Sequence, residues 1–151
     1  MIKGANTVGF LPRTSERPSW LPVDYAGRAI AEIVLAPPAP GARVYHVVNP
    51  NISATWDDLL NDLQAAGLKF EVVDIDQWLD RLDKSNKDPT VNPVIKLQDF
   101  FKKRYATKRA AMVFETSETS KVSPSIREAP GLSPKLVQKW VDHWRAVGFL
   151  A

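Results

Sequence analysis

Residues 20–34 read WLPVDYAGRAIAEIV, and this stretch decides how the rest of the chain is interpreted. Its opening, Trp20–Val23, is predicted to be a short buried strand, and Asp24 is predicted to cap the helix that follows directly. The apolar residues of that helix recur at helical spacing on one side, namely Ala26, Ala29, Ile30, Ile33 and Val34. A strand that leads into a capped helix is typical of an α/β fold.

The composition is that of a folded protein with one core. The chain has 151 residues, of which 44% are hydrophobic, so we expect a single domain over residues 1–151. Because there is no cysteine, disulfides and thiolate metal sites are excluded, which fits a reducing compartment. No apolar run approaches the roughly 20 residues that span a bilayer, and residues 1–10 lack the apolar core of a signal peptide. We therefore expect a cytoplasmic protein with no membrane partner.

Two further stretches have the composition of strands. Residues 43–50, RVYHVVNP, are rich in β-branched and aromatic residues and predict a strand buried on both faces of a mostly parallel sheet. Residues 69–75 alternate imperfectly and predict another strand. His46 lies inside the first of these strands, where a lone histidine is more often a hydrogen-bonded core residue than a catalytic base.

Helical periodicity is found in several other segments. Residues 1–10 resemble the end of a helix, and residues 11–19 are interpreted as a loop. Further helices are predicted to begin at Thr55, Asp76, Pro93 and Ser133. Their apolar stripes contain Trp56, Leu59, Leu60 and Leu63; Trp78, Leu79 and Leu82; Val94, Leu97, Phe100 or Phe101, and Tyr105; and Leu136, Val137, Trp140, Val141, Trp144 and Val147. Residues 114–131 are predicted to be an irregular crossing segment.

The motifs of several enzyme classes are missing. The sequence has no G-x-G-x-x-G, P-loop or G-x-S-x-G motif. Two histidines far apart and no cysteine leave no metal-ligand spacing, so no metal site is predicted. The carboxylates between Asp57 and Asp83 fall on exposed helix positions, with no reason to pair them as acid and base.

Positive charge is concentrated near one predicted helix end. The cluster consists of Lys102, Lys103, Arg104, Lys108 and Arg109. It can guide an acidic partner, or it can be an ordinary solvated helix end that favours the helix dipole. The same stretch interleaves aromatic and basic residues, as nucleic-acid binders do, but its aromatic positions also fit the buried helix stripe. With only one basic cluster in the chain, no nucleic-acid partner is predicted.

The order of the motifs resembles a known family. Residues 21–30, LPVDYAGRAI, resemble the late strand–helix signature of extended short-chain dehydrogenase/reductases, commonly of V-D-D-V-A-x-A-I type. Together with MIKGANTVGFLP before it, and with VYHVVNP, WDDLL and WVDHWRAVGFL after it, the chain resembles the C-terminal part of a carrier-protein thioester reductase domain. Such domains end nonribosomal peptide synthetases, polyketide synthases and carboxylic acid reductases. The resemblance covers nearly the whole chain.

This resemblance implies a fold and a function. The fold would be the C-terminal part of an extended short-chain dehydrogenase/reductase, α/β in class, with a few mostly parallel strands and a helical substrate-binding lobe. Family members take an acyl or peptidyl group from the phosphopantetheine arm of a carrier protein and reduce its thioester with NADPH to an aldehyde or alcohol. Their cofactor fingerprint and catalytic Tyr-x-x-x-Lys lie upstream of the matched region, and the spacing from Tyr105 to Lys108 is one residue short of that motif.

We therefore expect this chain to lack the nucleotide-binding N-terminal half, to bind no cofactor by itself and to be inactive alone, although NADPH is implied for the complete enzyme. No catalytic or cofactor-binding residue is assigned. The expected partners are an acyl or peptidyl carrier protein, the missing N-terminal half and, through open sheet edges, a second copy of the chain.

The resemblance also implies candidate site residues. The substrate-pocket candidates are Trp20, Pro22, Tyr25, Trp78, Phe100, Phe101 and Tyr105, although Trp20 next to a helix start can equally be a core residue. The carrier-docking candidates are Lys102, Lys103, Arg104, Lys108 and Arg109. An alternative function is a stand-alone, non-catalytic module that binds an acyl chain or a partner protein. An upstream cofactor fingerprint in the same reading frame would favour the reductase.

Overall fold

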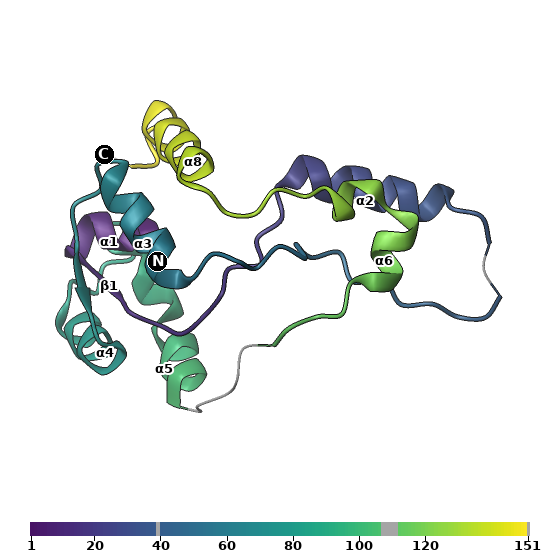
Figure 1. Cartoon of the computed structure of the whole chain (residues 1–151). Helices are drawn as coiled ribbons and strands as arrows, with labels where there is room; N and C mark the ends of the chain where they lie inside the picture. The colour runs from purple at the N-terminus through teal and green to yellow at the C-terminus, as the bar shows by residue number, and fades with distance from the viewer. Residues whose placement is uncertain (39, 107–111, 151) are drawn as a thin grey trace. The chain divides into compact units, whose positions relative to one another are not determined.

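The computed structural model describes residues 1–38, 40–106 and 112–150. They form two compact units, which are built from interleaved parts of the chain (Figure 1). Unit 1 comprises Met1–Glu16, Trp56–Ala110 and Ser133–Ala151, and unit 2 comprises Arg17–Thr55 and Ala111–Leu132. Among the described residues, no helix is long and apolar enough to span a membrane.

Unit 1 contains a small parallel sheet. Strand β1 (Phe10–Pro12) pairs with β2 (Glu71–Val73), with Leu11 opposite Val72. Helix α1 (Ile2–Val8) leads into β1 through Gly9, whose φ of 80° is left-handed and therefore suits glycine. The prediction of a strand within residues 69–75 is confirmed. The prediction of a loop over residues 11–19 is wrong at its start, because three residues ending in a proline are too short a pattern to indicate a strand.

The helices of unit 1 form where the apolar stripes were predicted, although Leu97 and Val147 of those stripes are exposed. They are α3 (Trp56–Ala65), α4 (Ile75–Lys84), the 3₁₀ helix η1 (Pro93–Leu97), α5 (Gln98–Ala106) and α8 (Pro134–Ala146). The stripe of α3 is buried and packs against α8. The Trp56 indole N–H donates to the carbonyl of Pro12 at 2.8 Å, which ties α3 to the end of β1. Helix α8 begins as predicted, since the Ser133 hydroxyl accepts a hydrogen bond from the Leu136 N–H.

A second core cluster lies between β1, β2, α4, η1 and α5. Its buried members are Phe10, Val73, Trp78, Leu82, Val94 and Phe101. Helix α1 packs against η1 at Gly4, where an added Cβ would lie only 2.8 Å from the Cβ of Val94. This core fixes the orientation of α5. Asp76, predicted to cap α4, lies within its first turn instead, and the helix is preceded by Asp74.

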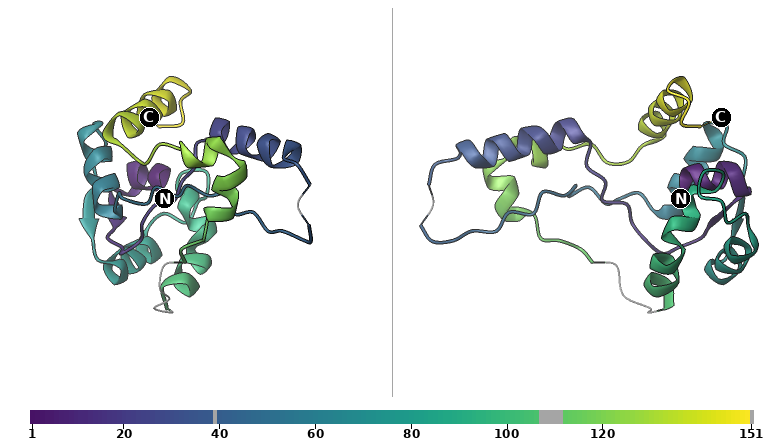
Figure 2. Two further views of the ribbon diagram at one scale, coloured as in Figure 1. Left: turned by 45° about the vertical axis from the view of Figure 1, so that its right-hand side comes forward. Right: turned by 180° about the vertical axis from the view of Figure 1, so that it is seen from behind.

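Unit 2 is built around α2 (Val23–Leu35), which packs against α6 (Ser117–Val122) and α7 (Pro124–Arg127) (Figure 2). The prediction of an irregular segment over residues 114–131 is therefore wrong in its middle part. Short helices rich in serine and threonine carry little apolar periodicity, so the sequence pattern did not indicate them. Ala29 of α2 and Ile126 of α7 are fully buried.

The strands predicted in unit 2 do not form. Among its described residues neither Trp20–Val23 nor residues 43–50 are in a strand, and Val23 already begins α2. A strand needs a neighbour that completes its hydrogen bonds, and the described part of unit 2 offers none. Asp24 is consequently not the cap. It lies in the first turn of α2, makes no side-chain cap hydrogen bond and pairs with Arg28 at 3.3 Å.

The loops of unit 2 are held together by a buried asparagine. The Asn49 side-chain amide donates to the carbonyls of Trp20 at 3.0 Å and Pro130 at 2.7 Å. Its side-chain oxygen accepts from the backbone N–H of Asn51. Gly131 lies directly against Asn51, where a Cβ would clash. Hydrogen bonds from one side chain therefore substitute for the predicted sheet in joining these segments.

Candidate functional site

Helix α5 presents most of the predicted site residues of unit 1. Phe101 points into the core, where its ring meets Trp78 edge-on at 5.1 Å. The ring of Tyr105 is stacked with that of Phe101, with ring centroids 6.3 Å apart. Phe100 is on the outside of the helix, 58% exposed, with its ring 5.4 Å from that of Phe101. The structure thus brings these four aromatic residues together, but as two buried rings, one half-buried ring and one exposed ring.

Tyr105 lies in a partly apolar environment beside an ion pair. Burial raises the pKa of its hydroxyl above the ordinary value, and the nearby Glu16 carboxylate adds to this effect. Glu16 is paired with the Arg104 guanidinium at 2.9 Å. Arg104, predicted to be a docking residue, is therefore already engaged in a half-buried contact that links α5 to the segment after β1.

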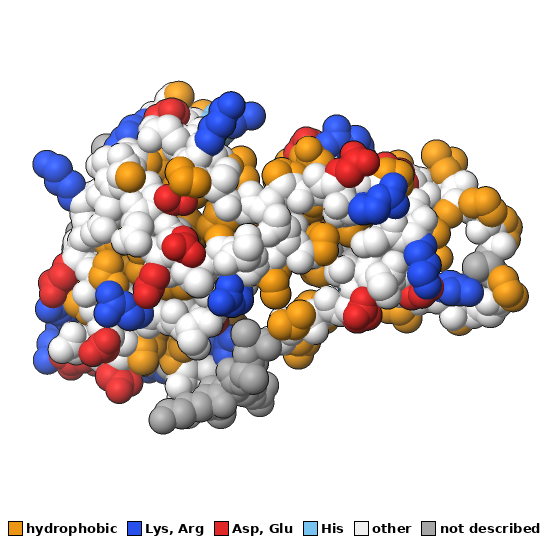
Figure 3. All heavy atoms as spheres, viewed as in Figure 1, with side chains coloured by type: hydrophobic (Ala, Val, Ile, Leu, Met, Phe, Trp, Pro, Cys, Tyr) orange, Lys and Arg blue, Asp and Glu red, His pale blue; other side chains and the backbone are white. Residues whose placement is uncertain are grey.

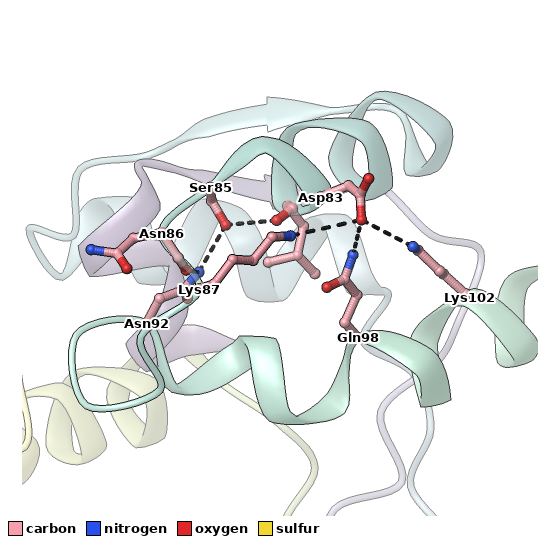
Figure 4. A network of polar contacts seen from close by, with 8 residues as sticks. Asp83, Ser85, Asn86, Lys87, Asn92, Gln98 and Lys102 are labelled. Atoms are coloured by element: carbon pink, nitrogen blue, oxygen red, sulfur yellow. Dashed lines mark hydrogen bonds and ion pairs between the residues drawn. The ribbon is translucent and has the colours of Figure 1, made fainter.

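Lys102 is also engaged within the unit (Figure 4). Its ammonium lies 3.0 Å from Asp83 of α4, and the same carboxylate oxygen accepts from Gln98 at 2.5 Å. The ammonium of Lys87 lies 3.7 Å away from that oxygen. These donors hold the pKa of Asp83 below its ordinary value, with the hydrogen bond from Lys102 as the largest cause and that from Gln98 next. The charge of Lys102 thus serves the contact between α4 and α5.

The turn between α4 and η1 is fixed by Asn92, which is fully buried (Figure 4). Its amide nitrogen donates to the Ser85 hydroxyl at 2.8 Å and to the Asn86 carbonyl at 3.0 Å. Ser85 in turn donates to the Leu82 carbonyl. This turn sets where η1 begins and therefore which side chains of η1 and α5 face outward.

Sequence reasoning missed two features of this region. The acidic partners Asp83 and Glu16 were not recognised, because each is far in sequence from the cation it binds. Leu97 was predicted on the buried face, yet it is 49% exposed. Residues 93–97 form a 3₁₀ helix, whose side chains repeat every three residues rather than every 3.6, so the face drawn with α-helical spacing was displaced.

The remaining pocket candidates belong to unit 2. Trp20 is 44% exposed, and Pro22 directly precedes α2. The half-buried ring of Tyr25 is covered by the Arg28 guanidinium, which lies 4.4 Å from the ring centroid. Trp20, Pro22 and Tyr25 stay predictions as substrate contacts. The docking candidates Lys108 and Arg109 lie outside the described residues.

The environment of His46 agrees with a structural role. Its Nδ1 lies 2.7 Å from the Glu115 carbonyl, and its ring packs against Phe114 at 5.1 Å. In residues 1–38, 40–106 and 112–150, no group of three or more histidine, cysteine, aspartate or glutamate side chains is placed to hold a metal ion.

Comparison with known proteins gives the relationships of the chain. No family model matches it. The chain is 28% identical over 153 residues to the citrinin polyketide synthase of Monascus ruber. This alignment covers 99% of the chain and 6% of the synthase. The chain is 33% identical over 160 residues to an adenylate-forming reductase of Aspergillus terreus, covering 99% of the chain and 14% of the reductase.

A solved structure, that of the terminal R domain from the myxalamid PKS-NRPS biosynthetic pathway, matches with a TM-score of 0.79 and 24% identity. The match covers 98% of this chain and 38% of that one. In sequence the chain is similar to parts of a polyketide synthase and of an adenylate-forming reductase, and in fold it is similar to a terminal R domain. This confirms the resemblance predicted from the sequence, and the likeness in structure confirms the fold class, a mixed α/β arrangement with a small parallel sheet. The chain spans 6% of the length of the citrinin polyketide synthase and 14% of the length of the adenylate-forming reductase.

Proposed function

We propose that this chain is the substrate-binding and carrier-docking portion of an NADPH-dependent reductase. The complete enzyme releases acyl or peptidyl groups bound as thioesters to a carrier protein, in the form of an aldehyde or an alcohol. The observation that supports this proposal most directly is the extent of the similarity. The R-domain fold is matched over 98% of the chain, and a relative named as a reductase aligns over 99% of it.

The placement of the candidate residues supports a binding role more than a catalytic one. Tyr105 of α5 and Tyr25 of α2 are half-buried aromatic residues with a polar end, which suits contact with an acyl chain and its pantetheine amides. Trp78 and Phe101 support the packing of α5 from the core. We assign no proton-transfer role to any of them, and we propose that NADPH is bound by another part of the complete enzyme.

Two measurements on the whole chain test this proposal. Titration with an acyl carrier protein from a polyketide synthase, loaded with acyl-phosphopantetheine, should show binding that weakens when the acyl group is removed. NADPH absorbance in the same mixture should not change. Steady NADPH oxidation by the chain alone, or equal failure to bind the loaded and the unloaded carrier protein, would contradict the proposal.

A third measurement separates this function from that of a stand-alone module. Adding the separately purified nucleotide-binding portion of a related R domain should restore thioester-dependent NADPH oxidation. Carrier binding that persists without any restored oxidation would favour a non-catalytic module instead.

A further inference from the structure

One face of η1 and α5 combines exposed apolar side chains with lysines. Phe100 and Leu97 are about half exposed, and Lys96 and Lys103 are exposed. Lys96 and Lys103 lie four and three residues from Phe100, and Leu97 lies three residues before it. The spacing of three residues places Phe100 and Lys103 on one side of α5, and Lys96 and Leu97 are the last two residues of η1, directly before α5. We call Lys96, Leu97, Phe100 and Lys103 the α5 outer face.

The α5 outer face rests on a rigid support. The ring of Phe100 is in contact with that of Phe101, and Phe101 packs edge-on against the fully buried Trp78. The opposite side of α5 is held to α4 through the hydrogen bonds of Asp83 with Lys102 and Gln98 (Figure 4). An exposed aromatic ring that is backed by a packed core loses little conformational entropy on binding, which is typical of an interface anchor.

The basic residues of η1 and α5 divide into those that form an ion pair and those that do not. Lys102 and Arg104 are each paired with a carboxylate of the same unit. In the described part of the chain, no ion pair is found for Lys96 or Lys103, the two lysines of the outer face. Asp99 is the one carboxylate within α5 itself. The outer face therefore keeps a net positive charge around its apolar centre.

We propose that the α5 outer face is the docking surface for an acidic amphipathic helix of the carrier protein. Apolar side chains of that helix would cover Phe100 and Leu97, and its carboxylates would lie beside Lys96 and Lys103. The inference rests on the proposed function and narrows it. Phe100 moves from the substrate pocket to the carrier interface, and Lys102 and Arg104 become residues that hold α5 in place.

The test measures the dissociation constant of the whole chain and a phosphopantetheinylated acyl carrier protein at low ionic strength. Lys103→Glu should weaken binding about tenfold by charge reversal, and Phe100→Ser should weaken it by a similar factor through the loss of the anchor. Lys135→Glu is the matched control, because Lys135 is an exposed lysine of α8 in the same unit. It should stay within about twofold of the parent chain.

The outcomes separate the two proposals. If the parent chain binds the carrier protein and Lys103→Glu and Phe100→Ser bind equally well, the docking surface is wrong and the proposed function stands. If the parent chain does not bind, both are wrong. Circular dichroism spectra that match the parent confirm that the variants are folded. Should Phe100→Ser unfold, Lys96→Glu replaces it, with the same expected weakening as Lys103→Glu.

Discussion

The carboxylate of Glu32 accepts two hydrogen bonds from Ser125, one from its backbone N–H at 3.1 Å and one from its hydroxyl at 2.7 Å. Ser123 donates to the same carboxylate at 2.5 Å and accepts from the N–H of Ile126. Because Ser123 and Ser125 flank the first residue of α7, Glu32 connects the last turn of α2 to the start of α7. The buried contact between these helices is therefore polar as well as apolar.

Replacing Glu32 by glutamine should loosen α2 at neutral pH. The hydrogen bonds from Ser123 and then from Ser125 hold the pKa of Glu32 below its ordinary value of 4.5. A lowered folded pKa means that the stabilisation is fully present above the ordinary value and is lost as the pH falls through the folded one. The protection factors of residues 23–35, which correct the hydrogen-exchange rates for their intrinsic pH dependence, should therefore fall in acid for the parent chain, and much less for Glu32→Gln.

At neutral pH the same measurement should show faster exchange in Glu32→Gln than in the parent. Lys121→Gln, which changes an exposed lysine of the neighbouring α6, serves as the control for altered surface charge. Equal protection of α2 in the Glu32→Gln variant and the parent chain at neutral pH would contradict this account of the contact.

The two helix starts that the sequence presents as capped should respond differently to alanine. Ser133→Ala removes a side-chain acceptor from the start of α8 and should lower the free energy of unfolding by about 0.5–2 kcal/mol. Asp24→Ala removes only an exposed ion pair in the first turn of α2, worth at most about 0.5 kcal/mol. Urea unfolding followed by circular dichroism compares them. An equal loss in both variants would mean that Asp24 acts as a cap after all.

The helices of unit 1 were predictable because the apolar residues that recur at helical spacing in the sequence are also the residues through which these helices pack. The apolar stripes of α3 and α8 pack against each other, so local periodicity and tertiary packing agree. The strand expected at residues 43–50 depends on a neighbour that the sequence pattern cannot specify. Composition alone indicated what this stretch can form, not what it forms within unit 2.

The candidate site was predictable only in part for a related reason. Aromatic spacing placed Phe101 and Tyr105 correctly on one side of α5, since both follow α-helical geometry. Whether a lysine is available for a partner depends on distant residues, as Lys102 with Asp83 illustrates. The exposed face of Phe100 and Leu97 depends on the 3₁₀ turn before α5, which the apolar pattern does not distinguish from an α-helical start.

The core around α4 should be sensitive to the removal of volume. Leu82 is fully buried among the residues of the second core cluster, so Leu82→Ala should lower the free energy of unfolding by about 2–5 kcal/mol. Leu97→Ala is the matched control, since Leu97 lies at the surface. This substitution should change the free energy of unfolding by about 0.5 kcal/mol or less. Urea unfolding followed by the fluorescence of the five tryptophans, of which Trp78 lies in this core, measures both variants. Similar losses in the two variants would contradict the assigned burial.

Helix α2 carries an apolar stripe on the side opposite its packed face, and unit 2 shows hydrophobic side chains at its surface (Figure 3). Val23, Ile30 and Val34 share this stripe with Gly27, at spacings of three, four and seven residues. Their exposed fractions are 86%, 55% and 76%. A contiguous apolar surface of this kind favours association, so we predict that the isolated chain self-associates through α2.

Light scattering over a range of micromolar concentrations tests this prediction. The average molar mass of the parent chain should rise with concentration, and Val34→Lys should shift that rise to higher concentration, because a charge placed within an apolar interface must be desolvated. Val91→Lys makes the same chemical change at an exposed valine of unit 1 and should leave the mass curve unchanged. If the parent chain stays monomeric throughout, the exposed stripe is tolerated in water, and the association predicted from it does not occur.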